Sequence, residues 1–169
     1  MNMIFKGLAV ISFLVKKMSE KYPTKQIGKT IIQKMMYLIK REGIVDYTYS
    51  MYHYGPYSSE VSSELNLCEA LDILAINWDP NKGYIIKRNE NKYEKELSKK
   101  DKKKIEKIVD KYGRFNAKEL SIIATAFFLK DEIGNISSNE ELVKIIASLK
   151  PDYDEGFIRN ILEKSGVIS

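Results

Sequence analysis

The sequence predicts a mostly helical α+β fold, and three observations support this prediction. Apolar residues recur at the spacing of a helical turn through most of the 169 residues. Two stretches rich in β-branched and aromatic residues, 46–53 and 76–87, interrupt the helical pattern and are typical of strands. The segment 24–88 therefore has the order helix, strand, helix, helix, strand, wing and strand, which is that of a winged helix. We expect a winged-helix-like N-terminal part with a small β-hairpin, packed on a C-terminal helical bundle.

The whole chain, 1–169, is expected to form a single domain, because its length supports one good core and is short for two ordinary domains. Within it, residues 1–22 are predicted to form a buried N-terminal helix. Residues 24–88 form the winged-helix-like part, and residues 98–169 form the C-terminal helices.

The N-terminal helix contains a mostly apolar run from Gly7 to Val15, flanked by lysines. A membrane-spanning helix needs about 20 apolar residues, and no small-residue cleavage site follows this run. We therefore expect a cytoplasmic protein without membrane contact. Because the run is apolar on all sides, the helix should be buried on several sides, and a homo-oligomeric contact through it is one option.

The winged-helix-like part begins with a helix that starts near Thr24 and ends at Gly43, since glycine takes the left-handed C-terminal position without a Cβ penalty. A strand is predicted over Asp46–His53, where β-branched and aromatic residues dominate. It ends in a turn formed by Gly55 and Pro56.

The segment 58–75 is predicted to contain two short helices. Ser58 is suited to capping the first of them. Asn66 has Glu69 three places on, a capping-box pattern that favours a helix break and a second start. If the segment is instead one continuous helix, the fold is only wing-like. A hairpin follows, with its turn at 79–82.

A polar linker is predicted over Lys87–Asp101, and four helices with apolar seams follow it. The second of these helices has almost no polar face, so it should lie at the centre of the C-terminal half. The four predicted helices are Lys102–Tyr112, Ala117–Asp131, Asn139–Leu149 and Asp154–Lys164.

The charge distribution bears on nucleic-acid binding. The formal net charge is +5, and the segment 87–111 alone has 11 basic and 6 acidic residues, so the remainder is neutral. The helix expected to read bases, Leu67–Ala75, has two acids and no Arg, Lys, Asn or Gln. Any DNA binding should thus be weak and non-specific, and it would use the basic residues Lys82, Lys87, Arg88, Lys102 and Lys103.

No pattern in the sequence indicates an enzyme, a cofactor or a metal site. His53 and Cys68 are the only His and Cys, they fall on different predicted elements, and no third residue orients them. A single cysteine excludes an intrachain disulfide. Asp152, Asp154 and Glu155 have some features of a cation site, but carboxylates near a helix start more often serve as caps.

Two short motifs resemble the Panacea domain family, which includes SocA-type antitoxins. The first is the helical run Thr30–Leu38, in which Ile32 and Met35 replace the family's usual leucines, and the second is Tyr54–Ser58. The likeness covers most of residues 24–130. It implies a non-enzymatic module that neutralises a toxin by direct contact, and it supplies no catalytic residues. The matching residues are Gln33, Lys34, Tyr37, Gly55, Pro56 and Ser58.

The sequence thus favours a protein-interaction module, antitoxin- or adaptor-like, whose partner is a protein such as a toxin. Tyrosine offers a large contact area with few rotatable bonds, so an exposed group of tyrosines is the expected partner-binding surface. The alternative is a DNA-binding winged-helix transcriptional regulator. The tyrosines predicted to bind the partner are Tyr49, Tyr52, Tyr54 and Tyr57.

Overall fold

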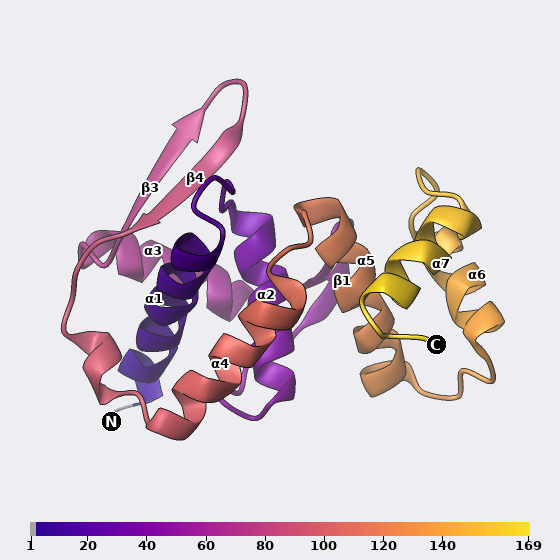
Figure 1. Ribbon diagram of the computed structural model, residues 1–169, viewed down its shortest axis with the longest axis horizontal. Coiled ribbons are helices and arrows are strands. Elements are labelled where there is room, and N and C mark those ends of the chain that lie inside the picture. The colour runs from indigo at the N-terminus through magenta and orange to yellow at the C-terminus, as the bar shows by residue number, and fades with distance from the viewer. Residues whose placement is uncertain (1–2) are drawn as a thin grey trace.

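The computed structural model describes residues 3–169, with side chains from Phe5 onward. The described chain is mostly helical, as predicted, and it contains two small antiparallel hairpins where one was predicted (Figure 1). The helices are α1 Met3–Lys21, α2 Lys29–Arg41, α3 Ser59–Ala70, α4 Lys99–Tyr112, α5 Ala117–Phe128, α6 Asn139–Leu149 and α7 Glu155–Lys164. The strands are β1 Ser50–Tyr52, β2 Gly55–Tyr57, β3 Leu74–Asp79 and β4 Gly83–Arg88.

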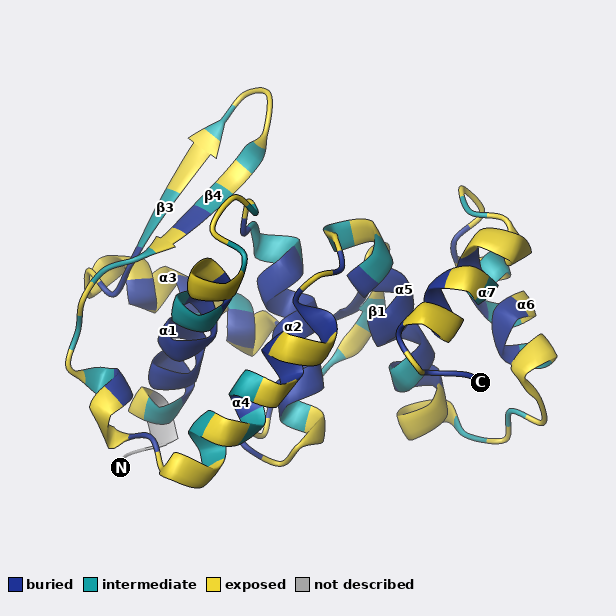
Figure 2. Cartoon of the chain, in the orientation of Figure 1, coloured by how far each residue is buried: buried dark blue, intermediate teal, exposed yellow. Residues whose placement is uncertain are grey.

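Helix α1 is buried within the chain itself (Figure 2). It packs against α3, α4 and the 3-10 turn Tyr93–Glu96, and every residue from Leu8 to Val15 is buried. These contacts account for the all-round apolarity that suggested a homo-oligomeric contact. No helix in the described part of the chain is long and apolar enough to cross a membrane.

Helix α2 begins at Lys29, later than the predicted start near Thr24. The reason is that the Ile27 carbonyl accepts a hydrogen bond from the Ile86 amide of β4 at 2.8 Å, so this backbone is used by the second hairpin. The predicted end is confirmed, because Gly43 follows the helix with a φ of 76°.

The predicted strand Asp46–His53 is shorter in the structure. Only Ser50–Tyr52 pairs, and its partner is Gly55–Tyr57, so the glycine and proline predicted to form a turn lie in a strand. Upstream, the Thr48 amide donates to the Glu60 carboxylate at 2.8 Å. This side-chain contact satisfies the Thr48 amide in place of the neighbouring strand that the sequence pattern predicts.

The predicted helix break at Asn66 is wrong. Helix α3 is continuous from Ser59 to Ala70, capped by the Ser58 hydroxyl as expected. Leu65 and Cys68 are both buried on one face, so continuing the helix buries more apolar surface than a new cap at Asn66 would allow. The predicted pair of short helices is therefore absent from 58–75, and the wing-like hairpin follows a single helix.

The predicted polar linker Lys87–Asp101 is also wrong in part. Its first two residues belong to β4, and Glu94 in its middle is buried and forms an ion pair with Arg88. The Arg88 guanidinium donates to both oxygens of the Glu94 carboxylate, at 2.5 and 3.0 Å. Glu94 also accepts from the Ser12 hydroxyl of α1, so this segment is fixed to the N-terminal helix.

Helix α5 lies between α2 on one side and α6 and α7 on the other (Figure 1). Its central position agrees with the prediction from its missing polar face. It continues as a π-helical turn, Leu129–Ile133, and Asn116 caps its start in a complete capping box with Glu119. Most buried side chains from α1 to Ile168 form one connected core, and Tyr37, Ala124 and Phe128 form a second, smaller cluster.

Candidate functional site

The hairpin β1–β2 is held against α2 by two buried polar side chains. The Gln33 amide donates to the Ser58 carbonyl at 2.9 Å and accepts from the Ser58 amide at 3.0 Å. The Lys34 ammonium donates to the Pro56 carbonyl at 2.9 Å. Residues of the two motifs thus contact one another directly, and their role is to fix the hairpin and the start of α3.

Gly55 lets the same hairpin approach α5. Its φ is 97°, and a Cβ at this position would lie 2.8 Å from the Thr125 hydroxyl and 3.1 Å from the Ser121 carbonyl. Tyr37 packs edge-on against Tyr49, just before the hairpin, with the two ring centroids 5.0 Å apart. Burial raises the pKa of the Tyr37 phenol, which stays protonated.

Two buried lysines contact this hairpin without a carboxylate partner. Lys150, 7% exposed, donates to the Ser121 hydroxyl at 2.7 Å and lies 3.4 Å from the His53 carbonyl. Burial lowers the pKa of Lys150 to about 8. Burial, together with the nearby charge of Lys150, lowers the pKa of Lys34 to about 7. Within residues 5–169, neither lysine forms an ion pair.

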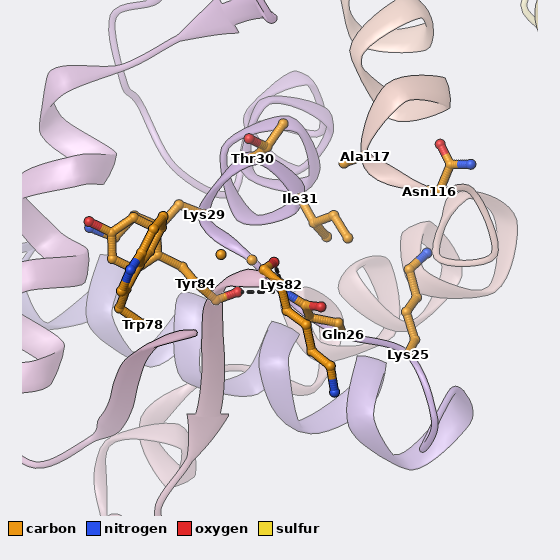
Figure 3. A pocket seen from close by; sticks show the side chains of 12 residues that line it. Lys25, Gln26, Lys29, Thr30, Ile31, Trp78, Lys82, Tyr84, Asn116 and Ala117 are labelled. Carbon is orange, nitrogen blue, oxygen red and sulfur yellow. Dashed lines mark hydrogen bonds between the residues drawn. The ribbon is translucent and has the colours of Figure 1, made fainter. Parts of the chain in front are cut away.

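A hollow of about 560 Å³ lies between the β3–β4 hairpin and the starts of α2 and α5; we call it the wing hollow. Figure 3 shows Trp78, Tyr84 and Lys29 gathered at one end and Asn116 and Lys25 at the other. The Lys29 ammonium lies 3.9 Å from the centre of the Tyr84 ring, and Trp78, 64% exposed, meets the same ring edge-on.

The position of the β3–β4 hairpin is set by Gln26. Its amide donates to the carbonyls of Lys82 and Tyr84, at 2.7 and 2.9 Å, which ties the hairpin to the chain just before α2 (Figure 3). The start of α2 itself has no side-chain cap, because the residue there is Gly28. The first residues of α2 line the wing hollow, and no side chain caps their amides.

A second hollow of about 500 Å³ lies beside Lys150; we call it the lysine hollow. The turn of the β1–β2 hairpin, α5 and the α6–α7 connection surround it, and Tyr54 and Leu149 stand exposed at its rim. Thr30 and Ala117 line both hollows, so the two lie next to each other, and we call them together the groove. Its lining lysines are Lys25, Lys29, Lys82, Lys118 and Lys150, and its one lining carboxylate is Asp152.

The structure separates the four tyrosines predicted to bind a partner. Tyr52 and Tyr54 are 61% and 71% exposed at the end of the β1–β2 hairpin. Tyr57 is half-buried with its ring 5.0 Å from that of Tyr52. Tyr49 instead points inward, and its buried hydroxyl has no hydrogen-bond partner among the described residues. Exposed tyrosines therefore exist: Tyr52 contacts Tyr57, and Tyr54 lies on the adjoining turn.

The basic residues predicted for nucleic-acid binding do not form one surface. Lys82 and Lys87 are exposed on the β3–β4 hairpin, while Lys102 and Lys103 lie on α4, far from the hairpin tip in the view of Figure 1. Arg88 is occupied by its ion pair with Glu94. The sequence does not identify Trp78, Tyr84 or Lys150 as candidate site residues. Neither the exposure of a side chain nor the joining of distant segments leaves a local pattern in the sequence.

The other side chains that the sequence suggested for catalysis or metal binding lie on separate elements of the fold. Cys68 is buried, and burial raises the pKa of its thiol to about 12. His53 lies on the exposed hairpin turn, on a different element. Asp154 caps α7 by accepting from the Phe157 amide at 2.7 Å. The residues that the structure describes include no group of three His, Cys, Asp or Glu side chains arranged to hold a metal ion.

A family model described as antitoxin SocA-like, Panacea domain, matches residues 31–125, which is more than half of the chain. The matched segment runs from α2 to α5 and contains both hairpins and the contacts of Gln33 and Lys34 with the β1–β2 hairpin. A search of curated proteins found no match to the chain.

Proposed function

We propose that this chain, which belongs to the antitoxin SocA-like, Panacea domain family, is a non-enzymatic protein-interaction module that neutralises a toxin by direct contact. The observation that carries the proposal is the outer end of the β1–β2 hairpin. There Tyr52 and Tyr54 are exposed on a support that buried polar contacts hold in place.

The rigidity of this support favours tight binding. Exposed aromatic side chains contribute most of the energy at many interfaces, and a preformed surface loses little entropy on association. Gln33 and Lys34 satisfy the hairpin's backbone from α2, and Gly55 brings it onto α5. The tyrosines are thus presented by a hairpin that is packed on α2 and α5, rather than by a free loop.

The test is co-expression with the products of the neighbouring genes. We expect one product to arrest growth alone, and to be neutralised by this chain in a complex that elutes as one species in size-exclusion chromatography. Tyr52→Ala with Tyr54→Ala should weaken this complex by about 30-fold or more, the effect of losing an aromatic hot spot.

Ile133→Ala is the matched control, because Ile133 is 64% exposed on the π-helical turn, outside the hairpin. It should leave affinity unchanged. Equal neutralisation by the wild type and the tyrosine double variant would contradict the proposed surface. A chain that neutralises none of the neighbouring products would contradict the proposed function.

A DNA-binding regulator is the alternative proposal, and the exposed lysines of the β3–β4 hairpin favour it. Helix α3 counts against it, because the helix carries Glu60, Glu64 and Glu69 and no basic residue. Carboxylates pressed against phosphates would repel them.

A further inference from the structure

We infer that the groove formed by the wing hollow and the lysine hollow receives an acidic segment of the partner protein, with one of its carboxylates beside the ammonium of Lys150. This inference deepens the proposed function and rests on it. It assigns a second contact region, next to the exposed tyrosines, and gives the chemistry of what that region binds.

The first argument is the state of Lys150. Buried lysines are rare unless paired with an opposite charge, because removing an ammonium from water is costly. Lys150 is nearly inaccessible, lines the lysine hollow, and donates to one hydroxyl and one distant carbonyl. An ammonium has three N–H donors, so one donor and the full charge remain for a ligand. A carboxylate that enters the hollow would accept the remaining hydrogen bond and neutralise the charge.

The second argument is the charge of the whole groove. Its five lysines form no ion pair within the described chain, and the lining of the wing hollow contains no carboxylate. The uncapped start of α2 adds the partial positive charge of a helix N-terminus to the same side. Like charges around a concave surface attract an oppositely charged chain more strongly than isolated surface charges do.

The third argument concerns the apolar parts of the groove. Trp78 and Tyr84 stand exposed at one end, and Tyr54 and Leu149 stand exposed at the other. Apolar side chains of the bound segment would cover these residues while its acids meet the lysines. The groove is therefore complementary to a peptide that contains both acidic and apolar residues.

The same residues disfavour a single-stranded nucleic acid. The Lys29 ammonium covers one face of the Tyr84 ring, and Trp78 meets the ring edge-on, so less of Tyr84 is open for stacking a base. Asp152 lines the same hollow as Lys150. A polynucleotide carries a charge on every residue and would bring a phosphate to this carboxylate, whereas a peptide can place a neutral residue there.

The test is fluorescence polarisation with a short labelled peptide that alternates glutamate and leucine. The control ligands are the same peptide with glutamine in place of glutamate, and an oligo-dT of similar length. We expect saturable binding of the acidic peptide and about tenfold or greater loss on Lys150→Met. Lys103→Met, the matched control, removes an exposed lysine of α4 outside the groove and should leave binding unchanged.

A second variant covers the case in which Lys150→Met fails to fold. Lys29→Gln with Lys82→Gln changes two groove lysines that make no ion pair, and it should weaken the peptide by about tenfold as well. In a titration followed by NMR of labelled lysine, bound peptide should raise the pKa of Lys150 from its lowered value.

The inference is overturned if the acidic and glutamine peptides bind alike, if oligo-dT binds more tightly than the acidic peptide, or if both groove variants bind like Lys103→Met. Its failure is separable from that of the proposed function. If Lys29→Gln with Lys82→Gln still neutralises the toxin while the tyrosine double variant does not, the groove inference fails and the tyrosine surface stands.

Discussion

Lys34 and Lys150 show how single residues serve both the fold and the site. The Lys34 amine donates to the Pro56 carbonyl of the β1–β2 hairpin, and the Lys150 amine donates to Ser121 of α5 and, more distantly, to the His53 carbonyl of the hairpin turn. These contacts satisfy hydrogen bonds but do not neutralise the charges. The hairpin is therefore held by groups whose protonation costs stability, and pH should reveal this.

We predict that the free energy of unfolding rises between pH 7 and about pH 8.5. The folded pKa values of Lys34 and Lys150, about 7 and about 8, lie below the ordinary value of 10.5. Over this range the unfolded chain binds more protons than the folded one, so folding becomes more favourable as pH rises. Above it, Cys68 opposes the trend, because its thiol ionises near pH 9 when unfolded but not when buried.

Urea unfolding at several pH values measures this slope. Lys34→Met removes one of the two titrating amines, so its profile should be flatter, whereas Lys103→Met, which changes an exposed lysine, should keep the wild-type slope. A wild-type stability that is constant or falls from pH 7 to about pH 8.5 would contradict the prediction.

At the scale of elements, the β1–β2 hairpin depends on Gly55. We predict that Gly55→Val destabilises the protein by about 1–3 kcal/mol, because a φ of 97° is strained for a β-branched residue. The added side chain would also meet the Thr125 hydroxyl and the Ser121 backbone of α5. The measurement is the midpoint of thermal unfolding.

Gly43→Val is the matched control for this contact. Gly43 also has a positive φ, 76°, but a Cβ there would meet nothing within 4 Å. Both variants therefore carry the backbone cost, and only Gly55→Val forces the hairpin away from α5. An unchanged midpoint for Gly55→Val, or equal losses for the two variants, would show that the hairpin does not depend on this close approach.

The sequence predicts elements wherever local signals agree with packing. Gly43, Ser58 and Asn116 mark helix ends correctly because a cap depends on the backbone next to it. Asn66 fails for the opposite reason, since the buried face of α3 outweighs a local capping pattern. Glu94 is predicted to lie in a polar linker. Its burial depends on its contact with Ser12, which is distant in the sequence and leaves no local pattern.

The same distinction applies to the candidate site. The exposure of Tyr52 and Tyr54 agrees with the expected group of exposed tyrosines, because a cluster of aromatic residues around a short strand is visible in the sequence. The groove was not found, because Thr30 and Ala117, which join its two hollows, are far apart in the chain. A concave surface depends on how α2, α5 and the two hairpins meet, and no local pattern records that.

At the scale of the whole molecule, basic residues are distributed over separate regions. The β3–β4 hairpin presents Lys82 and Lys87, and α4 presents Lys102 and Lys103 far from the hairpin tip (Figure 1). A duplex cannot engage both regions through one continuous contact with the hairpin. Arg88, which could have read a base edge, is paired with a buried carboxylate.

We therefore predict that affinity for duplex DNA is weak, non-specific and lost as salt rises. A hairpin with two free lysines and a neighbouring basic residue would contact about three phosphates, which gives a slope of log K against log salt of about −3. Discrimination between sequences should be slight, because α3 has no Arg or Gln, and Asn66 is its only side chain that could make a bidentate contact with a base. Fluorescence anisotropy with random and native-promoter duplexes, from about 50 to about 200 mM salt, measures both quantities.

Lys82→Gln with Lys87→Gln should reduce the salt slope by about 2, because each lysine lost removes about one phosphate contact. Lys102→Gln with Lys103→Gln carries the same change in charge on α4 and separates a hairpin contact from general attraction. If both pairs lower the slope alike, binding is spread over the surface. Nanomolar, sequence-selective binding that survives about 200 mM salt would require a recognition element other than α3, and the regulator would then replace the antitoxin as the better proposal.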